Sequence, residues 1–120
     1  MKNRVLGKTG LEVNELGLGG LFVSSFGADF ENAKKAILMA LELRVNYIDT
    51  APTYANSEEV LGKVLEEVST PVILSTKLGG RPQPFNPQDK KCLMRSVEES
   101  LRLLKRNYID ILMIQKAVKQ

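Results

Sequence analysis

The stretch that decides the fold is Val45-Asn46-Tyr47-Ile48-Asp49-Thr50-Ala51-Pro52-Thr53-Tyr54, together with Val72-Ile73-Leu74-Ser75-Thr76-Lys77 further along the chain. Residues 45–48 are short and β-prone, and residues 72–74 form the near-continuous apolar run typical of a parallel strand covered on both faces. Between them apolar residues recur at helical spacing, and Pro71 prevents that helix from continuing. The pattern predicts a strand-helix-strand unit with Asp49 and Lys77 at the strand ends.

The same alternation continues on both sides of this unit. Asp29 and Asn86 are predicted N-caps of two further helices. Strands that alternate with helices predict an α/β fold with a parallel sheet and right-handed crossovers. The expected elements, in order, are a hairpin around the turn at 7–10, strand 16–19, helix 30–43, strand 45–48, a helix from 56 or 57, strand 72–74, a helix from 86 to 106 and strand 108–114.

Composition places the chain among globular proteins. Its 120 residues suit one domain spanning residues 1–120, with 43% hydrophobic and 26% charged residues. The net charge of +3 comes from basic residues that are scattered and mixed with acids, which disfavours nucleic-acid binding. We therefore expect a soluble protein with one core and no nucleic-acid partner.

Cysteine usage and hydropathy indicate a cytoplasmic location. Cys92 is alone in the sequence, lies in a helical pattern and is expected to be a small buried residue, so there is no disulfide framework. We expect no metal site, no signal peptide and no membrane association, because no apolar run approaches the ~18 residues of a membrane span.

Four polar side chains fall where the expected strands end: Asp49, Lys77 and Gln115 directly, and Tyr54 in the loop after residues 45–48. The carboxyl ends of the strands form the active face of a (β/α) barrel. Tyrosine is a slow acid near neutral pH, and a nearby ammonium such as Lys77 would make its proton easier to release. Asp49 would keep Lys77 charged and oriented. Spacing alone leaves open a structural ion pair beside a solvated tyrosine.

A glycine segment, Gly17-Leu18-Gly19-Gly20-Leu21-Phe22, overlaps the end of the expected strand 16–19. It is not a dinucleotide-binding fingerprint, because Phe22 occupies the third glycine position. Gly19 and Gly20 either let the backbone approach closely at the barrel mouth or are turn residues.

Six segments together carry a family resemblance that covers almost everything up to Ile114. They are residues 6–13, 16–20, 46–54, 57–58 with 61–62, 75–77 and 109–114. All six look like segments of the aldo-keto reductases, in the order of that family. A different (β/α)-barrel enzyme with a similar motif is the less favoured alternative, because the hairpin and the glycine segment match as well.

The resemblance implies an activity and roles for site residues. Asp49, Tyr54 and Lys77 would match the catalytic aspartate, tyrosine and lysine, and the tyrosine would protonate the carbonyl of a small aldehyde or ketone that NADPH reduces. Gly20 and Asp49 would contact this cofactor. Gln115 stands where the family has a histidine, and it can donate an amide hydrogen bond but cannot shuttle a proton.

The length of the chain changes what it is expected to do. A complete barrel needs roughly 250 residues, so we expect a half-barrel, the first four parallel strands of a (β/α)8 barrel with an N-terminal β-hairpin. Such a chain is expected to be inactive by itself, to bind NADPH poorly, and to form a homo-oligomer through its open sheet edges. The alternative to a truncated enzyme is a non-enzymatic folding or interaction module.

Overall fold

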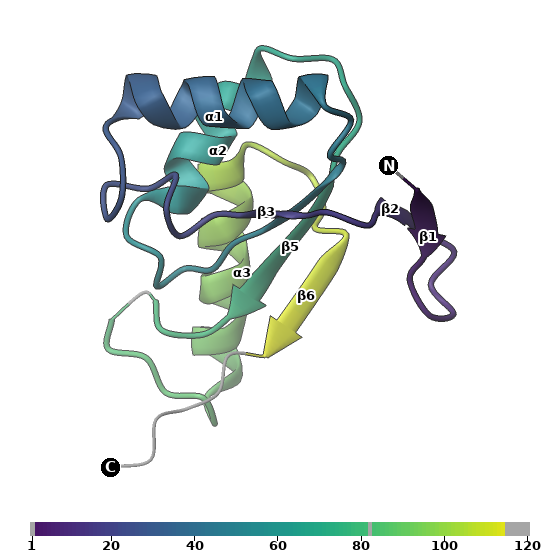
Figure 1. Cartoon of the computed structure of the whole chain (residues 1–120). Helices are drawn as coiled ribbons and strands as arrows, with labels where there is room; N and C mark the ends of the chain where they lie inside the picture. Colours follow the sequence, from purple (N-terminus) through teal and green to yellow (C-terminus); the bar gives the residue numbers. More distant parts are fainter. Residues whose placement is uncertain (1, 82, 115–120) are drawn as a thin grey trace.

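The computed structural model describes residues 2–81 and 83–114, which form two sheets (Figure 1). A small antiparallel hairpin pairs β1 (Asn3–Val5) with β2 (Glu12–Asn14). The main sheet is parallel and has the order β3-β4-β5-β6, in which every crossover adds the next strand. Its strands are β3 (Leu18–Gly19), β4 (Tyr47–Asp49), β5 (Ile73–Leu78) and β6 (Ile111–Ile114). The α/β half-barrel with an N-terminal hairpin is therefore confirmed.

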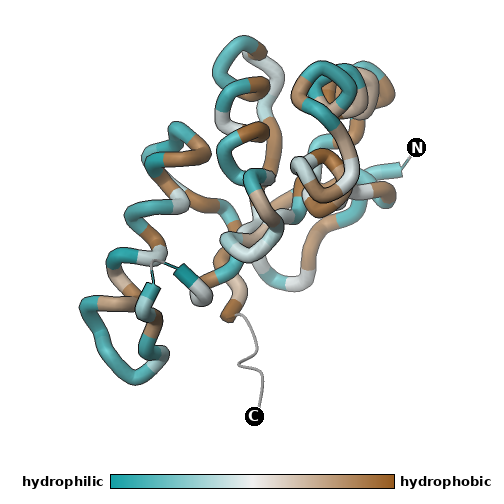
Figure 2. Tube along the Cα trace, turned by 90° about the vertical axis from the view of Figure 1, so that its left-hand side faces the viewer, coloured by the Kyte–Doolittle hydropathy of each residue, from teal (hydrophilic) through white to brown (hydrophobic). Residues whose placement is uncertain are grey.

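Three helices follow the first three strands of the main sheet: α1 (Phe30–Glu42), α2 (Ser57–Glu66) and α3 (Lys90–Leu104). In Figure 1 they lie in order along one side of the sheet, with α2 between α1 and α3. Apolar and polar segments alternate along the helices in Figure 2, as expected for helices that bury one face. None of the helices in the described ranges is long and apolar enough to cross a membrane.

The starts of α1 and α2 agree with the sequence expectation, and the start of α3 differs. Asp29 caps α1 by accepting a hydrogen bond from the Asn32 amide at 2.8 Å. Asn56 occupies the N-cap position of α2, and its side-chain oxygen accepts from the Ser25 amide at 2.7 Å, which attaches the loop after β3 to this helix start. Asn86 does not cap α3. Its side chain closes a local turn by accepting from the Gln88 amide, and Asp89 caps the helix instead.

The core lies between the sheet and the three helices. Cys92 is buried in it, as predicted. Of the large apolar residues that recur at helical spacing along α3, Leu104 is buried, whereas Leu93, Val97 and Leu101 are only half-buried, and small residues make up the rest of the buried face. Small side chains let α3 approach its neighbours closely, which is why the periodicity of the large residues alone placed this face only in part. The buried residues of α3 are Cys92, Ser96, Ser100 and Leu104.

The last strand is shorter than predicted because a side chain takes over part of its hydrogen bonding. β6 begins at Ile111, and the Asp110 carboxylate just before it accepts a hydrogen bond from the Leu74 amide of β5 at 2.9 Å. From there the ladder runs in regular parallel register, with Lys77 opposite Met113. Asp110 therefore occupies the place of a backbone partner at the start of this strand pair.

The outer edge of β6 carries apolar side chains. No strand of the described residues pairs with this edge or with the outer edge of β3. Ile114 is 84% exposed, and Leu112 and Met113 are also exposed. An unpaired apolar edge of this kind favours association with another chain.

Candidate active site

The proposed catalytic groups lie at the carboxyl ends of β4 and β5. The register pairs Asp49 with Ser75, and the Thr50 amide donates to the Ser75 carbonyl at 2.8 Å, so the two strands end side by side. Lys77 lies two residues beyond Ser75, and its long side chain reaches back toward β4. Parallel pairing is thus sufficient to bring Asp49 and Lys77 to one point.

Lys77 and Asp49 form a close ion pair. The Lys77 Nζ lies 3.2 Å from Asp49 Oδ1 and 3.1 Å from Asp49 Oδ2, and it donates to the Thr50 carbonyl at 2.9 Å. The Lys77 side chain is 16% exposed and that of Asp49 is 32% exposed. A backbone carbonyl and both carboxylate oxygens therefore hold the ammonium at a half-buried position that a small molecule could still reach.

Tyr54 comes to the same site from the loop between β4 and α2. The loop is a compact turn, in which the Tyr54 amide donates to the Ala51 carbonyl and the Ser57 amide donates to the Tyr54 carbonyl. The Lys77 Nζ lies 5.0 Å from the centroid of the Tyr54 ring, within the range of a cation–π contact. The structure thus brings Asp49, Tyr54 and Lys77 together, whereas Gln115 lies outside the described residues.

Gly20 joins the end of β3 to this site through its backbone. Its amide donates to the Asp49 carbonyl at 2.7 Å, and a β-carbon at this position would lie 2.6 Å from Ser57 Oγ and 2.9 Å from Thr50 Oγ1. Those two hydroxyls are themselves 2.7 Å apart. Close approach, the first of the two alternatives from sequence, therefore explains this glycine. Its contact with a cofactor stays a prediction.

A second charged cluster beneath the site was missed from the sequence. Glu58, in the first turn of α2, is 2% exposed, and its carboxylate accepts from the Thr76 hydroxyl at 2.7 Å and pairs with the Arg81 guanidinium. Arg81 is thus part of a buried ion pair and is not an isolated surface cation. A signal was present, because Glu58 lies three residues before the buried Leu61 and so on the apolar face of α2.

The cluster extends to the surface of α3. Arg81 also lies 3.8 Å from Glu99, which pairs with Arg102. The hydrogen bond from Arg102, with a further contribution from the charges of Arg102 and Arg81, holds the pKa of the Glu99 carboxyl below its ordinary value. Because Thr76 immediately precedes Lys77, these contacts fasten the carboxyl end of β5 to both neighbouring helices.

A parallel sheet covered by helices, with polar groups at the carboxyl ends of its strands, defines the chain as part of a (β/α)-barrel enzyme fold. The model of the Aldo/keto reductase family matches residues 15–118. The chain belongs to the aldo-keto reductase family, whose members are generally oxidoreductases that use NAD(P)H.

Individual relatives agree with this assignment. The chain is 33% identical over 118 residues to an uncharacterized oxidoreductase, YqkF, of Bacillus subtilis, covering 92% of this chain and 38% of that protein. It is 36% identical over 116 residues to L-galactose dehydrogenase of Arabidopsis thaliana, covering 91% and 36%. Among solved structures, the holo form of aldo-keto reductase AKR11C1 from Bacillus halodurans matches with a TM-score of 0.79 and 34% identity, covering 95% and 40%. The chain thus spans less than half of these proteins.

Proposed function

We propose that this chain carries the proton-donating part of the active site of an NADPH-dependent reductase of aldehydes or ketones. The observation that carries the proposal is the Lys77 ammonium, held by Asp49 and Thr50 and positioned over the Tyr54 ring. A carbonyl that accepts a hydride gains negative charge on its oxygen, and a positioned phenol can protonate that oxygen. The nearby ammonium stabilises the phenolate left behind.

The residues present fit a nicotinamide cofactor in part. Asp49 keeps about a third of its side chain exposed at 32%, so its carboxylate can accept a hydrogen bond from a ribose hydroxyl while it holds Lys77. Gly20 brings the backbone after β3 to the same edge. When bound, NADPH would supply the hydride. In this proposal, Tyr54 donates the proton to the carbonyl oxygen. Lys77 polarises the Tyr54 hydroxyl, and Asp49 orients Lys77.

For the 120-residue polypeptide alone, we predict no tight binding of NADPH. The four described strands of the main sheet offer Asp49 and Gly20 as contacts, and a cofactor of this size needs many more to offset the entropy of binding. A fluorescence titration should show no saturation up to about 10 μM, a dissociation constant that corresponds to about −7 kcal/mol. Saturation below that concentration would show that β3 to β6 and their loops are sufficient for tight binding of NADPH.

In a complemented enzyme, in which a relative supplies the later strands as a fusion or a separate chain, Tyr54→Phe should reduce carbonyl reduction by about 10²-fold or more. Binding of NADPH should change little, because a general acid acts chiefly in the transition state. The control is Tyr108→Phe, which removes a hydroxyl from a side chain that is 62% exposed. Equal turnover in Tyr54→Phe and Tyr108→Phe would exclude Tyr54 as the proton donor.

A second candidate function, a non-enzymatic interaction module, is favoured by the exposed edge of β6. We propose that a second copy of the chain covers this edge, because burying each large apolar side chain is worth roughly 1.5–3 kcal/mol. Light scattering should then give a mass near twice 13.3 kDa or above. Ile114→Lys should lower that mass, whereas Phe26→Lys, at an exposed position in another segment, should not. A soluble monomer at ~100 μM would contradict the proposal, because the apolar edge of β6 would then remain in water without a second copy covering it.

A further inference from the structure

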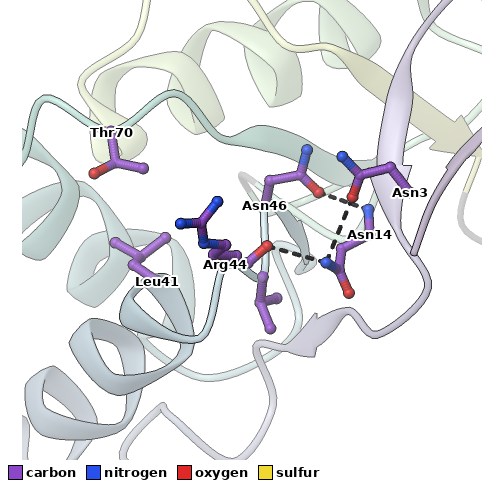
Figure 3. Close-up of a pocket in the computed structure, with 7 residues that line it drawn as sticks. Asn3, Asn14, Leu41, Arg44, Asn46 and Thr70 are labelled. Atoms are coloured by element: carbon purple, nitrogen blue, oxygen red, sulfur yellow. Dashed lines mark hydrogen bonds between the residues drawn. The ribbon is translucent and has the colours of Figure 1, made fainter. Parts of the chain in front are cut away.

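A pocket of about 370 Å³ lies at the opposite end of the main sheet from Lys77. It is formed where the hairpin, the end of α1 and the segments that precede β4 and β5 meet (Figure 3). Its lining includes Asn3, Asn14, Arg44, Asn46 and Thr70. The volume falls in the range of small-molecule sites, and no aspartate or glutamate is among the lining residues.

The wall of this pocket is held by side-chain amides. Asn14 is 5% exposed; its backbone amide donates to Asn46 Oδ1 at 2.7 Å, and its side-chain amide donates to the Arg44 carbonyl at 3.2 Å. Asn46 in turn donates to the Glu12 carbonyl at 2.9 Å. These bonds attach the hairpin to the sheet and fix the Asn14–Asn46 wall of the pocket, whereas Arg44 and Thr70 line it from exposed turns.

Arg44 has an unusual backbone for an arginine. It follows α1 with φ at +69°, in the left-handed conformation that a β-carbon disfavours and that glycine usually adopts at a helix end. Lys105 ends α3 in the same way, with φ at +56°, and its ammonium pairs with Glu66 at 2.7 Å. Arg44 is exposed, its guanidinium forms no ion pair within residues 2–81 and 83–114, and Figure 3 shows it among the lining residues.

We propose that this pocket binds a phosphate group, free or carried by a small molecule, with Arg44 as its charged ligand. A guanidinium offers paired donors that match phosphate oxygens, and the Asn3 amide and the Thr70 hydroxyl add neutral donors from other sides. An uncompensated cation in a pocket without carboxylates favours an anion over a neutral ligand. The site is separate from the catalytic groups and does not depend on the proposed reductase function.

The test is a nuclear magnetic resonance titration of the 120-residue chain with inorganic phosphate, and separately with glycerol 3-phosphate, at constant ionic strength. Saturable shifts are expected in the backbone amides of Arg44, Asn46 and Thr70 with at least one of these probes. Phosphate alone would indicate a free anion site, and glycerol 3-phosphate alone a phosphorylated small molecule. Glycerol serves as the neutral control and should cause no saturable shift.

Two glycine variants separate binding from folding. Arg44→Gly relieves the left-handed backbone, so its thermal midpoint should equal or exceed that of the parent, while its phosphate affinity should fall at least about tenfold, as expected for a lost charged hydrogen bond. Lys105→Gly makes the matched change at the end of α3 and should keep the affinity. The proposal is overturned if no probe gives saturable shifts, if the shifts map to residues around Lys77, or if Arg44→Gly binds as tightly as Lys105→Gly.

Discussion

Gly62→Ala should destabilise the chain by roughly 3 kcal/mol, although alanine is the better helix former. Gly62 lies in α2, and a β-carbon there would be only 2.0 Å from the backbone carbonyl oxygen of Leu103 in α3. A backbone atom cannot move aside as a flexible side chain can, so the two helices would have to separate. Urea denaturation measures the change in the free energy of unfolding.

The control for this experiment is Gly19→Ala in β3. A β-carbon at Gly19 would meet no atom within 4 Å, so this variant should unfold close to the parent midpoint. If Gly62→Ala were as stable as Gly19→Ala, α2 and α3 would not pack backbone to backbone. A gain of about 1 kcal/mol, the value expected from helix propensity alone, would lead to the same conclusion.

Arg81→Met should have a comparable effect for an electrostatic reason. It leaves the Glu58 carboxylate, which is 2% exposed, without its cationic partner, and breaking a buried ion pair from one side costs about 3–5 kcal/mol. The double variant with Glu58→Gln should recover much of this loss, because a neutral amide costs less to bury than an unpaired charge. Denaturant unfolding of the single and double variants measures the coupling free energy.

Arg102→Met provides the matched control. Arg102 also pairs with a glutamate, Glu99, but its side chain is 68% exposed, and an exposed pair contributes little because water and salt screen it. The lowered pKa of Glu99 implies that the stabilisation from this pair is present above the ordinary pKa of glutamate and is lost as the pH falls. If Arg81→Met and Arg102→Met lost equal stability, the Glu58 pair would be behaving as a surface pair.

The sequence predicted those parts of the site that depend on strand topology. Asp49 and Lys77 each follow an apolar run, and parallel pairing aligns the carboxyl ends of neighbouring strands, so their contact could be expected from the sequence alone. The strand order and the crossover helices follow from the same alternation. Gln115 is not tested, because it lies outside the described residues.

The parts that could not be predicted depend on contacts between segments distant in sequence. The Glu58–Arg81 pair joins residues that are 23 positions apart in the sequence. Neither helical spacing nor the charge pattern predicts which residue pairs with a buried carboxylate. The buried face of α3 was predicted only in part, at Cys92 and Leu104, because large apolar residues dominate a periodicity argument, whereas close packing also selected Ser96 and Ser100. The need for glycine at position 62 could not be predicted for the same reason, because it comes from the backbone of α3 that faces Gly62.

The hydrogen bond of the Asp110 carboxylate helps to fix the register of β6 against β5. A slip of β6 along β5 by two residues would preserve which side chains face the core, and hydrophobic burial alone would therefore discriminate weakly against it. Such a slip would carry Asp110 away from the Leu74 amide and leave that donor unpaired in a buried segment. A single side chain thereby selects one of several sterically acceptable registers, the one that sets Met113 level with Lys77.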